Sequence, residues 1–499
     1  MQKGLKQKLS QYIDAHFPIL YINSFESDKV DDMIREIGDW REIIEWNGAR
    51  GMVDFNTKVP FLVGNESLSD MLNFYLEKDE LANKLIVLKD IHSQLEDPEI
   101  VAKLKIIANL INQDADAAVI IVSTVVVIPA ELEKYITILE MDYLATEEIR
   151  DLILKCMKGL GVSAIEDTLI DDFAMAFKGL SAFEIENLLS LAYASNDGEL
   201  TRKDLSLIFE QKQQTIKKAG ILEMIPLKES LEDIGGLENL KAWLKKKAKV
   251  FQNISAAQKF GVDMPKGVLV AGVPGCGKSL SAKAIAHLFE VPLLRMDMGR
   301  LMGKYVGESE ANMRKAISLA EAISPCVLWI DELEKAFAGL GNTGGGAEVT
   351  TRLFGYFLTW LQEKTSPVFV VATANDITKL PSELMRKGRF DEIFYIGLPK
   401  PEERRKIFEI HIKKRRPHDY DKINISSLVN KTEGFSGADI EGVVKDAVEA
   451  AFAEDRPSLR TEDIERAIKE TNSLIELMGD SLKKLIQEYE KRKYKNAAR

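Results

Sequence analysis

Residues 272–279 combine glycines with two side chains that suit phosphate binding. They read Gly-Val-Pro-Gly-Cys-Gly-Lys-Ser and follow the apolar run 267–271. A buried strand that leads through a glycine-rich turn into a helix points backbone N–H groups and the positive helix end at a phosphate. Lys278 can then reach the β- and γ-phosphates of ATP, and the Ser279 hydroxyl can bind Mg²⁺. The candidate nucleotide-contacting residues are Gly272, Val273, Pro274, Gly275, Cys276, Gly277, Lys278, Ser279 and Leu280.

Two carboxylates and an amide follow the next apolar runs and could complete a hydrolytic site. Residues 327–330 lead into Asp331 and Glu332, and residues 368–373 lead through an alanine into Asn375. The carboxyl ends of parallel strands meet at one edge of a sheet, where ligands bind. We expect Asp331 to bind Mg²⁺, Glu332 to act as the general base, and Asn375 to orient the attacking water.

Two arginines lie three positions apart beside a glycine, at Arg386 and Arg389. A guanidinium near a hydrolysable phosphate stabilises transition-state charge, and a neighbouring subunit can supply it. Both arginines fit this role. A solvated basic turn is the alternative interpretation.

These residues require a parallel α/β sheet to bring them together. Short apolar runs alternate with helical patterns in both halves of the chain, which is typical of such a sheet. In the first half the predicted strands are residues 17–22, 84–90 and 118–124. The apolar run 117–130 is shorter than the ~20 residues of a membrane-spanning helix, so we interpret it as a buried strand. Residues 146–218 are predicted to be mostly helical, ending in a polar linker from residue 211.

The two halves of the chain resemble each other. Three short similarities recur in the same order: residues 129–132 with 381–384, 179–186 with 434–441, and 200–205 with 459–464. A tandem duplication explains them, although a separate α/β domain with accidental similarity is the alternative. The first copy has no glycine-lysine-serine loop and no strand that ends in Asp-Glu, so we expect it not to hydrolyse nucleotide.

The composition is that of a globular chain with few disulfide prospects. Of 499 residues, 45% are hydrophobic and 29% charged, and the net charge of −11 argues against a nucleic-acid partner. Three scattered cysteines fit a reducing compartment, and the first residues have no apolar signal core. We expect a cytoplasmic protein with no membrane attachment.

In this order, the motifs resemble the AAA clade of the AAA+ ATPases over residues 227–475. The run 354–375 and the degenerate first copy are most similar to the hypothetical-chloroplast-frame AAA proteins of cyanobacteria and plastids, which would place the chain in a plastid stroma if it is plastid-encoded. The resemblance implies an α/β fold with a P-loop AAA+ module, a parallel sheet plus a helical lid, preceded by a degenerate AAA-like α/β domain. The implied domains are the degenerate domain at 1–145, a lid-like helical subdomain and linker at 146–220, the ATPase core at 227–400, the lid at 401–475 and a charged helix at 476–499.

The resemblance also implies roles for residues outside the motifs already described. Ile234, Gly235, Ile407 and His411 should lie near adenine, and Gly437 and Ala438 of the lid should close over the nucleotide. The clade has alanine, not arginine, at the position of Ala438 in the lid. The resemblance therefore implies that Arg386 and Arg389 of a neighbouring subunit complete the site, in a ring that is usually a hexamer. ATP and Mg²⁺ are the implied ligands.

Two further residues carry hypotheses of their own. Tyr305, in Lys-Tyr-Val-Gly, resembles the pore-loop aromatic that grips polypeptide in ring unfoldases of the clade, although a packed tyrosine is the alternative. The glycine-rich run 339–346 could be a second pore-facing loop. Cys276 could be a reactive thiol, because a helix N-terminus lowers a thiol's pKa.

Three functions are compatible with the sequence. The first is an ATP-driven machine that remodels a protein partner. The second is a slow, nucleotide-gated regulatory or scaffold protein whose first copy binds partners. The third, a nucleic-acid motor, is disfavoured by the acidic composition.

Overall fold

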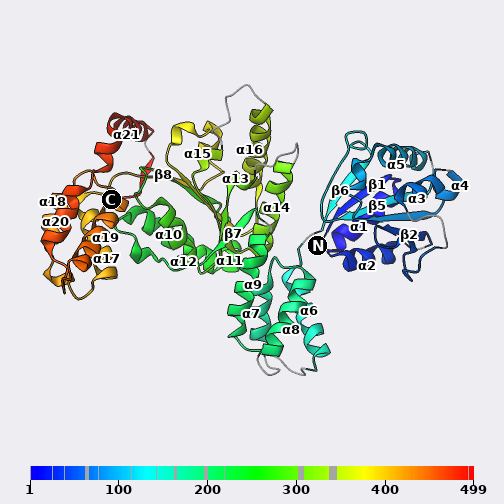
Figure 1. Ribbon diagram of the computed structural model, residues 1–499, viewed down its shortest axis with the longest axis horizontal. Coiled ribbons are helices and arrows are strands. Elements are labelled where there is room, and N and C mark those ends of the chain that lie inside the picture. Colours follow the sequence, from blue (N-terminus) through cyan, green and yellow to red (C-terminus); the bar gives the residue numbers. More distant parts are fainter. Residues whose placement is uncertain are drawn as a thin grey trace. The chain divides into compact units, whose positions relative to one another are not determined.

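The computed structural model contains two compact units, Met1–Ile208 and Phe209–Arg499 (Figure 1). The residues it describes are 2–24, 26–38, 40–61, 67–76, 78–113, 115–141, 143–161, 166–195, 200–218, 220–301, 308–336, 345–492 and 494–499. Tyr305 and most of the glycine-rich run 339–346 lie outside these ranges.

The second unit is built on a mostly parallel sheet. In the described part of the chain its strand order is β13-β12-β8-β11-β10-β9-β7. The strands are β7 Leu222–Ile225, β8 Gly267–Gly272, β9 Leu293–Met296, β10 Cys326–Ile330, β11 Val368–Ala374, β12 Glu392–Ile396 and β13 Lys495–Asn496. Every residue of β8, β10 and β11 is buried, as expected for central parallel strands that are covered on both faces.

Helices cover both faces of this sheet. They are α10 Glu238–Gln252, α11 Ile254–Lys259, α12 Lys278–Phe289, α13 Met298–Leu301, α14 Glu308–Ile323, α15 Leu333–Ala336 and α16 Gly345–Glu363. Helices α10 and α12 share one apolar core with β8, β10 and β11, so the helix that follows the phosphate loop is anchored directly on the sheet.

Four helices form the lid, with a core of their own (Figure 1). They are α17 Pro401–Arg415, α18 Ile425–Asn430, α19 Gly437–Ala453 and α20 Thr461–Glu470. Helix α17 begins with a proline, has two glutamates in its first turn and three basic residues in its last, which matches the helix dipole at both ends. Helix α21, Leu474–Lys491, follows the lid and is kinked at Gly479.

The first unit repeats the strand order of the second. Its sheet runs β3-β2-β4-β5-β1-β6, with β1 Ile19–Asn23, β2 Glu42–Asn47, β3 Gly51–Asp54, β4 Lys84–Lys89, β5 Ala117–Ser123 and β6 Ile136–Glu140. Apart from the antiparallel β3, the order β6-β1-β5-β4-β2 matches β12-β8-β11-β10-β9 strand for strand. The predicted AAA-like α/β domain is therefore confirmed as a fold.

Helices of the first unit complete this picture. Those around the sheet are α1 Gln2–Asp14, α2 Ser27–Ile37, α3 Leu68–Phe74, α4 Lys78–Leu81 and α5 Pro98–Ile111. A helical subdomain follows with α6 Thr146–Gly159, α7 Asp167–Phe177, α8 Ala182–Ser195 and α9 Asp204–Lys218. Helix α9 continues past the boundary between the two units to Lys218, so the polar run 211–218 is helical.

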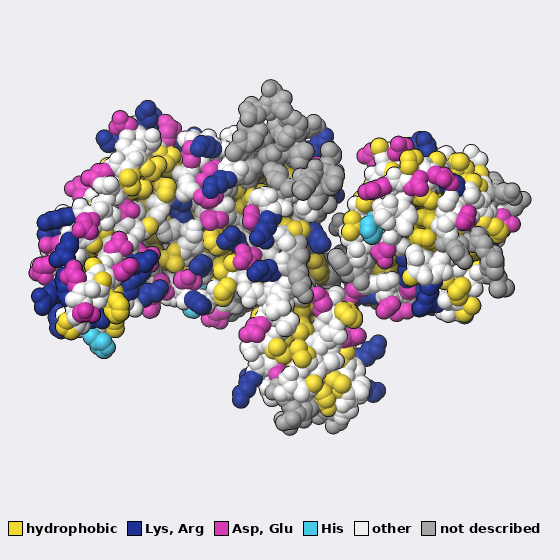
Figure 2. All heavy atoms as spheres, viewed as in Figure 1, with side chains coloured by type: hydrophobic (Ala, Val, Ile, Leu, Met, Phe, Trp, Pro, Cys, Tyr) yellow, Lys and Arg dark blue, Asp and Glu magenta, His cyan; other side chains and the backbone are white. Residues whose placement is uncertain are grey.

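Two other expectations from the sequence can be compared with the structure. The strand predicted at 117–130 ends at Ser123, and residues 124–130 continue as irregular chain and turn. Among the described helices, none is long and apolar enough to cross a bilayer. Figure 2 shows acidic and basic side chains interspersed on the visible face.

Candidate functional site

The phosphate-binding loop lies between β8 and α12, as the sequence predicts. Gly277 caps α12 with a left-handed φ of 91°, and the helix begins at Lys278. The Lys278 side chain is buried, and its Nζ donates to the carbonyl oxygens of Gly272 at 3.0 Å and Val273 at 2.8 Å. Burial lowers the pKa of Lys278 to about 8. The ammonium is thus held inside the loop by the loop's own backbone.

The lid packs directly on this loop at Gly275. The Ala438 backbone N–H donates to the Gly275 carbonyl at 2.9 Å. Gly275 has a φ of +73°, and a Cβ there would lie 2.8 Å from Ser436 Oγ, so only glycine fits. Gly437 comes equally close, since its Cβ would lie 3.2 Å from the Gly275 carbonyl. The first turn of α19 therefore closes over the loop.

Ser279 and Asp331 meet at the carboxyl edge of the sheet. Ser279 Oγ donates to Asp331 Oδ1 at 3.2 Å. The same Oδ1 accepts a hydrogen bond from Thr373 Oγ1, and Thr373 Oγ1 in turn accepts the Glu332 backbone N–H at 3.1 Å. Glu332 has a left-handed φ of 50°, a backbone conformation that residues other than glycine adopt infrequently. Thr373 thus connects the two carboxylate residues.

Asn375 lies beside the Glu332 carboxylate. Its Nδ2 donates to Glu332 Oε1 at 3.2 Å, and its backbone N–H donates to Glu334 Oε1 at 3.0 Å. Glu334 is buried, whereas the other oxygen of Glu332 pairs with the exposed Lys335 at 2.5 Å. The amide and the carboxylate are therefore held together on the edge where the phosphate loop ends.

The donor atoms at this edge suit Mg²⁺ bound together with phosphate. Ser279 and Asp331 offer a hydroxyl and a carboxylate oxygen, both hard ligands. Among the described residues, no group of three or more His, Cys, Asp or Glu side chains could hold a metal.

The predicted adenine-side residues also come together. A Cβ at Gly235 would lie 2.4 Å from Ile407 Cγ1, so the segment before α10 touches α17 directly. Ile407 Cδ1 would lie 3.8 Å from a Cβ at Gly437, and Ile234 is buried. His411, one turn after Ile407, is mostly buried, and burial lowers its pKa. These contacts bring the segment before α10, the lid and the phosphate loop next to one another.

The two arginines lie elsewhere in the same unit. Arg386 is exposed, and its side chain makes no hydrogen bond or ion pair with any residue of the described ranges. Arg389 donates through Nη1 to the Glu383 carbonyl. Within the described part of the chain, neither arginine makes a hydrogen bond or ion pair with the phosphate loop.

One expectation about the loop is wrong. Burial raises the pKa of Cys276 to about 11, although Lys278 nearby opposes the shift. The thiol hydrogen points to the Pro274 carbonyl at 3.7 Å. Burial in the covered loop raises the pKa of Cys276 more than the helix N-terminus lowers it. The thiol therefore favours its protonated form and is not an activated thiolate.

The first unit carries a lysine at the position of Asp331. Strands β5 and β11 have seven residues each and pair with β1 and β8 at equivalent positions. In that alignment Lys89, opposite Val122, corresponds to Asp331, and Asp90 corresponds to Glu332. Asp90 even shares the left-handed backbone, with a φ of 53°.

Lys89 belongs to a buried ion cluster in the first unit. Its Nζ lies 2.7 Å from Asp31 Oδ2 and 3.3 Å from Glu45 Oε2. Lys58 pairs with the same two carboxylates at 3.0 and 2.5 Å. Asp31 and Glu45 are 4% and 3% exposed. Burial raises the pKa of Glu45, but the two lysines outweigh it and hold that pKa below its usual value. A protein ammonium therefore occupies the side of the sheet where the second unit has Ser279 and Asp331.

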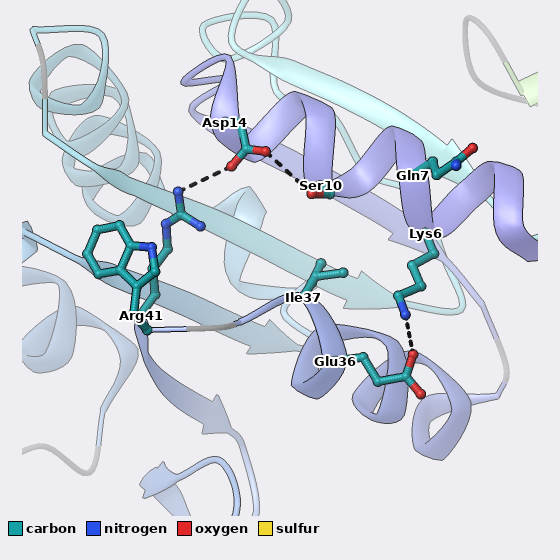
Figure 3. A pocket seen from close by; sticks show the side chains of 8 residues that line it. Lys6, Gln7, Ser10, Asp14, Glu36, Ile37 and Arg41 are labelled. Atoms are coloured by element: carbon teal, nitrogen blue, oxygen red, sulfur yellow. Dashed lines mark hydrogen bonds and ion pairs between the residues drawn. The ribbon is translucent and has the colours of Figure 1, made fainter.

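A depression of about 520 Å³ lies between α1 and α2, apart from this cluster (Figure 3). Its charged side chains pair with one another: Lys6 with Glu36, and Arg41 with Asp14. It offers no convergent set of unpaired polar groups.

Sequence reasoning missed three residues that contact the candidate site. Thr373 and Glu334 hold Asp331, Glu332 and Asn375, and Tyr489 reaches the Asn375 carbonyl. A threonine in the otherwise apolar run 368–374 was a signal, because a buried polar residue is informative. Nothing local marks Glu334 or Tyr489.

Family models match four parts of the chain. Residues 268–398 match the ATPase family associated with various cellular activities (AAA), and residues 422–466 match the AAA+ lid domain. Residues 5–141 and 141–219 match the N-terminal and second domains of SpoVK-like AAA ATPases.

Similar proteins include two algal relatives over almost the whole length. The AAA domain-containing protein ycf46 of Guillardia theta is 40% identical over 462 residues. The aligned region covers 92% of this chain and 89% of the Guillardia theta protein. The ycf46 protein of Pyropia yezoensis is 38% identical over 467 residues, covering 93% of each chain. The cell division cycle protein 48 homolog of Archaeoglobus fulgidus is 32% identical over 311 residues, which is 59% of this chain and 41% of that protein.

Proposed function

Because this chain belongs to the AAA ATPase family, with ycf46 proteins as its near-full-length relatives, we propose that it binds and hydrolyses Mg·ATP in the second unit. The observation that carries the proposal is the chain of contacts from Ser279 through Asp331 and Thr373 to Glu332 and Asn375. It joins the phosphate loop to two carboxylates and an amide at one sheet edge.

In this proposal each residue has a distinct task. Lys278 and the loop amides bind the β- and γ-phosphates, and Ser279 with Asp331 holds the metal. Mg²⁺, when bound, neutralises charge that develops on the phosphate oxygens. Glu332 takes the proton from the attacking water, and Asn375 orients that water. The 3.2 Å contact between the Asn375 amide and the Glu332 carboxylate supports this pairing of roles.

The remaining residues bind the nucleoside and close the site. We assign the adenine contacts to Ile234, Gly235, Ile407 and His411, and the closing contacts to Gly437 and Ala438. The hydrogen bond from Ala438 to Gly275 supports the closure, since a lid that rests on the loop can respond to the phosphates bound there.

We further propose that Arg386 and Arg389 act across a subunit boundary in a ring, most simply a hexamer. The exposed Arg386 side chain has no ion pair within the described residues, which suits a group that completes a neighbour's site. ATP-driven movement would then remodel a protein partner, with Tyr305 as the substrate contact. No nucleic acid or membrane partner is part of the proposal, and the compartment is the cytoplasm or a plastid stroma.

A slow nucleotide-gated regulator or scaffold is the second candidate. It is favoured by the ion cluster of Lys89 in the first unit, because a domain whose site is closed by its own lysine is suited to binding partners. In that case the second unit would switch between states without driving a motor.

Replacing the general base tests both candidates. The Glu332→Gln variant should bind ATP with unchanged affinity and lose turnover by at least ~100-fold, since a general base contributes about that much. Its particle mass with Mg·ATP should approach six chains. Retained turnover would refute the role of Glu332. A monomer or dimer at saturating ATP would favour the switch and remove the roles of Arg386 and Arg389 in trans.

A further inference from the structure

Strand β13 joins the C-terminal segment to the edge of the ATPase sheet. It runs parallel to β12, with Lys495 opposite Phe394 and Asn496 opposite Tyr395. The Ala497 N–H continues the pairing by donating to the Tyr395 carbonyl at 2.9 Å, and Ala497 is fully buried. Ala497 is therefore part of the core of the second unit, whereas Lys495 and Asn496 are exposed at the sheet edge.

The same segment fixes the start of α10. The Ala497 carbonyl accepts the backbone N–H groups of Asn239 at 3.0 Å and Leu240 at 3.2 Å. The N-cap residue, Leu237, provides no side-chain hydrogen bond, so the segment satisfies N–H groups that a helix start leaves open. Helix α10 follows directly on Ile234 and Gly235.

Tyr489, at the end of α21, extends this contact to the catalytic edge. Its side chain is 1% exposed, and its ring stacks on Tyr395 with centroids 4.5 Å apart. The Tyr489 hydroxyl donates to the Asn375 carbonyl at 3.3 Å and accepts the Ile377 N–H at 3.3 Å. One buried hydroxyl thus satisfies two backbone groups of the turn that follows β11.

We propose that Tyr489 is a positioning residue for Asn375, an inference that rests on the proposed ATPase function. The Asn375 peptide is held on both sides, by Glu334 at its N–H and by Tyr489 at its carbonyl. Its side-chain amide reaches Glu332 from this fixed backbone. The C-terminal segment therefore sets where the water-orienting amide stands.

The contacts of Tyr489 predict that its hydroxyl affects ATP turnover but not nucleotide binding. Within the described residues, the hydrogen bonds and the ring contact of Tyr489 go to Asn375, Ile377 and Tyr395, and to none of residues 272–280 or the adenine-side residues. Removing its hydroxyl leaves a carbonyl and an N–H unpaired in a buried place, and the turn relaxes to find other partners. The Asn375 amide then loses alignment with Glu332, whereas the phosphate loop is unaffected.

The test compares Tyr489→Phe with a matched control in the full-length protein. Phenylalanine keeps the ring stacked on Tyr395 and removes only the hydroxyl. Tyr494→Phe is the control, because Tyr494 lies in the same segment and its side chain makes no hydrogen bond with another described residue. The measurements are kcat and KM for ATP, the Kd of a non-hydrolysable ATP analogue, Tm, and hydrogen exchange of the peptide around Ile377.

We expect kcat of Tyr489→Phe to fall by about tenfold to a hundredfold, as small misplacements do. KM and Kd should stay within about twofold of wild type. Exchange should become faster around Ile377 but not in α12, and Tyr494→Phe should resemble wild type throughout.

Other results would overturn the inference. Unchanged kcat in Tyr489→Phe would show that the hydroxyl does not position Asn375. A joint loss of affinity, Tm and protection across the whole core would show a merely structural role. If wild type itself fails to hydrolyse ATP, the proposed function fails instead. In that case, unchanged exchange around Ile377 in Tyr489→Phe would overturn the positioning contact, and faster exchange would support it.

Discussion

Removing the hydroxyl of Thr373 while keeping its shape should separate Asp331 from Glu332. Thr373→Val deletes the hydrogen bond to Asp331 Oδ1 and leaves the Glu332 N–H without its acceptor. Thr373 is 1% exposed, so water does not readily replace the hydroxyl. A hydrogen bond to a charged group contributes about 1.5–3 kcal/mol, and an unpaired buried N–H costs about 1–3 kcal/mol. Because Asp331 keeps Ser279 as a partner, we expect a loss of about 2–3 kcal/mol in unfolding free energy.

The effect on catalysis should exceed the effect on binding. Glu332 has a left-handed backbone that its N–H bond to Thr373 helps to hold, so its carboxylate should lose its position. We expect kcat to fall by about 10–100-fold in Thr373→Val, with ATP affinity changed by less than about threefold.

Steady-state kinetics, analogue binding and denaturant titration measure these quantities, and Thr373→Ser is the matched control. Serine keeps the hydroxyl and removes one methyl group, so it should restore most of kcat. If Thr373→Val turns over ATP at the wild-type rate, or if Thr373→Ser is as impaired as the valine variant, the hydroxyl does not hold the catalytic carboxylate and the reasoning is wrong.

Two further predictions concern Lys89, which pairs with buried carboxylates, and the buried Lys278. Lys89→Met removes one of two cations from Asp31 and Glu45; it should lower the unfolding free energy of the first unit by about 3 kcal/mol in denaturant titration and leave ATP turnover unchanged. If Lys89→Met unfolds with the same free energy as wild type, the ion pairs of Lys89 do not stabilise the first unit. The pKa of Lys278 is lowered to about 8, and bound phosphates favour its charged form, so the complex holds more protons than the free protein above that pH. Affinity for an ATP analogue should fall about tenfold from pH 7 to pH 9, measured by calorimetry, and a flat profile would contradict the shift.

Local motifs made much of the second unit predictable. The phosphate loop, Asp331, Glu332 and Asn375 each follow an apolar run, and parallel strands bring the ends of such runs to one edge. The structure confirms these strands and places the four features together. Their roles in catalysis stay predictions, because proximity alone does not establish them.

Contacts between distant parts of the chain could not be predicted. Tyr489 meets Asn375 across 114 positions, and a tyrosine in a Lys-rich helix has no local signal for that contact. Cys276 was misjudged for a related reason: its pKa depends on burial within the covered loop, which the sequence around it does not specify. The equivalence of Lys89 and Asp331 needed the strand register, since a shift of one residue would turn the lysine to the other face.

The two sheets share a strand order but carry opposite charges at one pair of equivalent positions, Lys89 and Asp331. In the second unit a carboxylate stands at this position, and Asp331 Oδ1 accepts hydrogen bonds from the hydroxyl groups of Ser279 and Thr373. In the first unit Lys89 stands at that position and is neutralised by Asp31 and Glu45. A bound Mg·nucleotide would bring further charge against these buried pairs, and separating them costs several kcal/mol. We therefore expect nucleotide to bind in the second unit, where the lid rests on the phosphate loop through the hydrogen bond from Ala438 to Gly275.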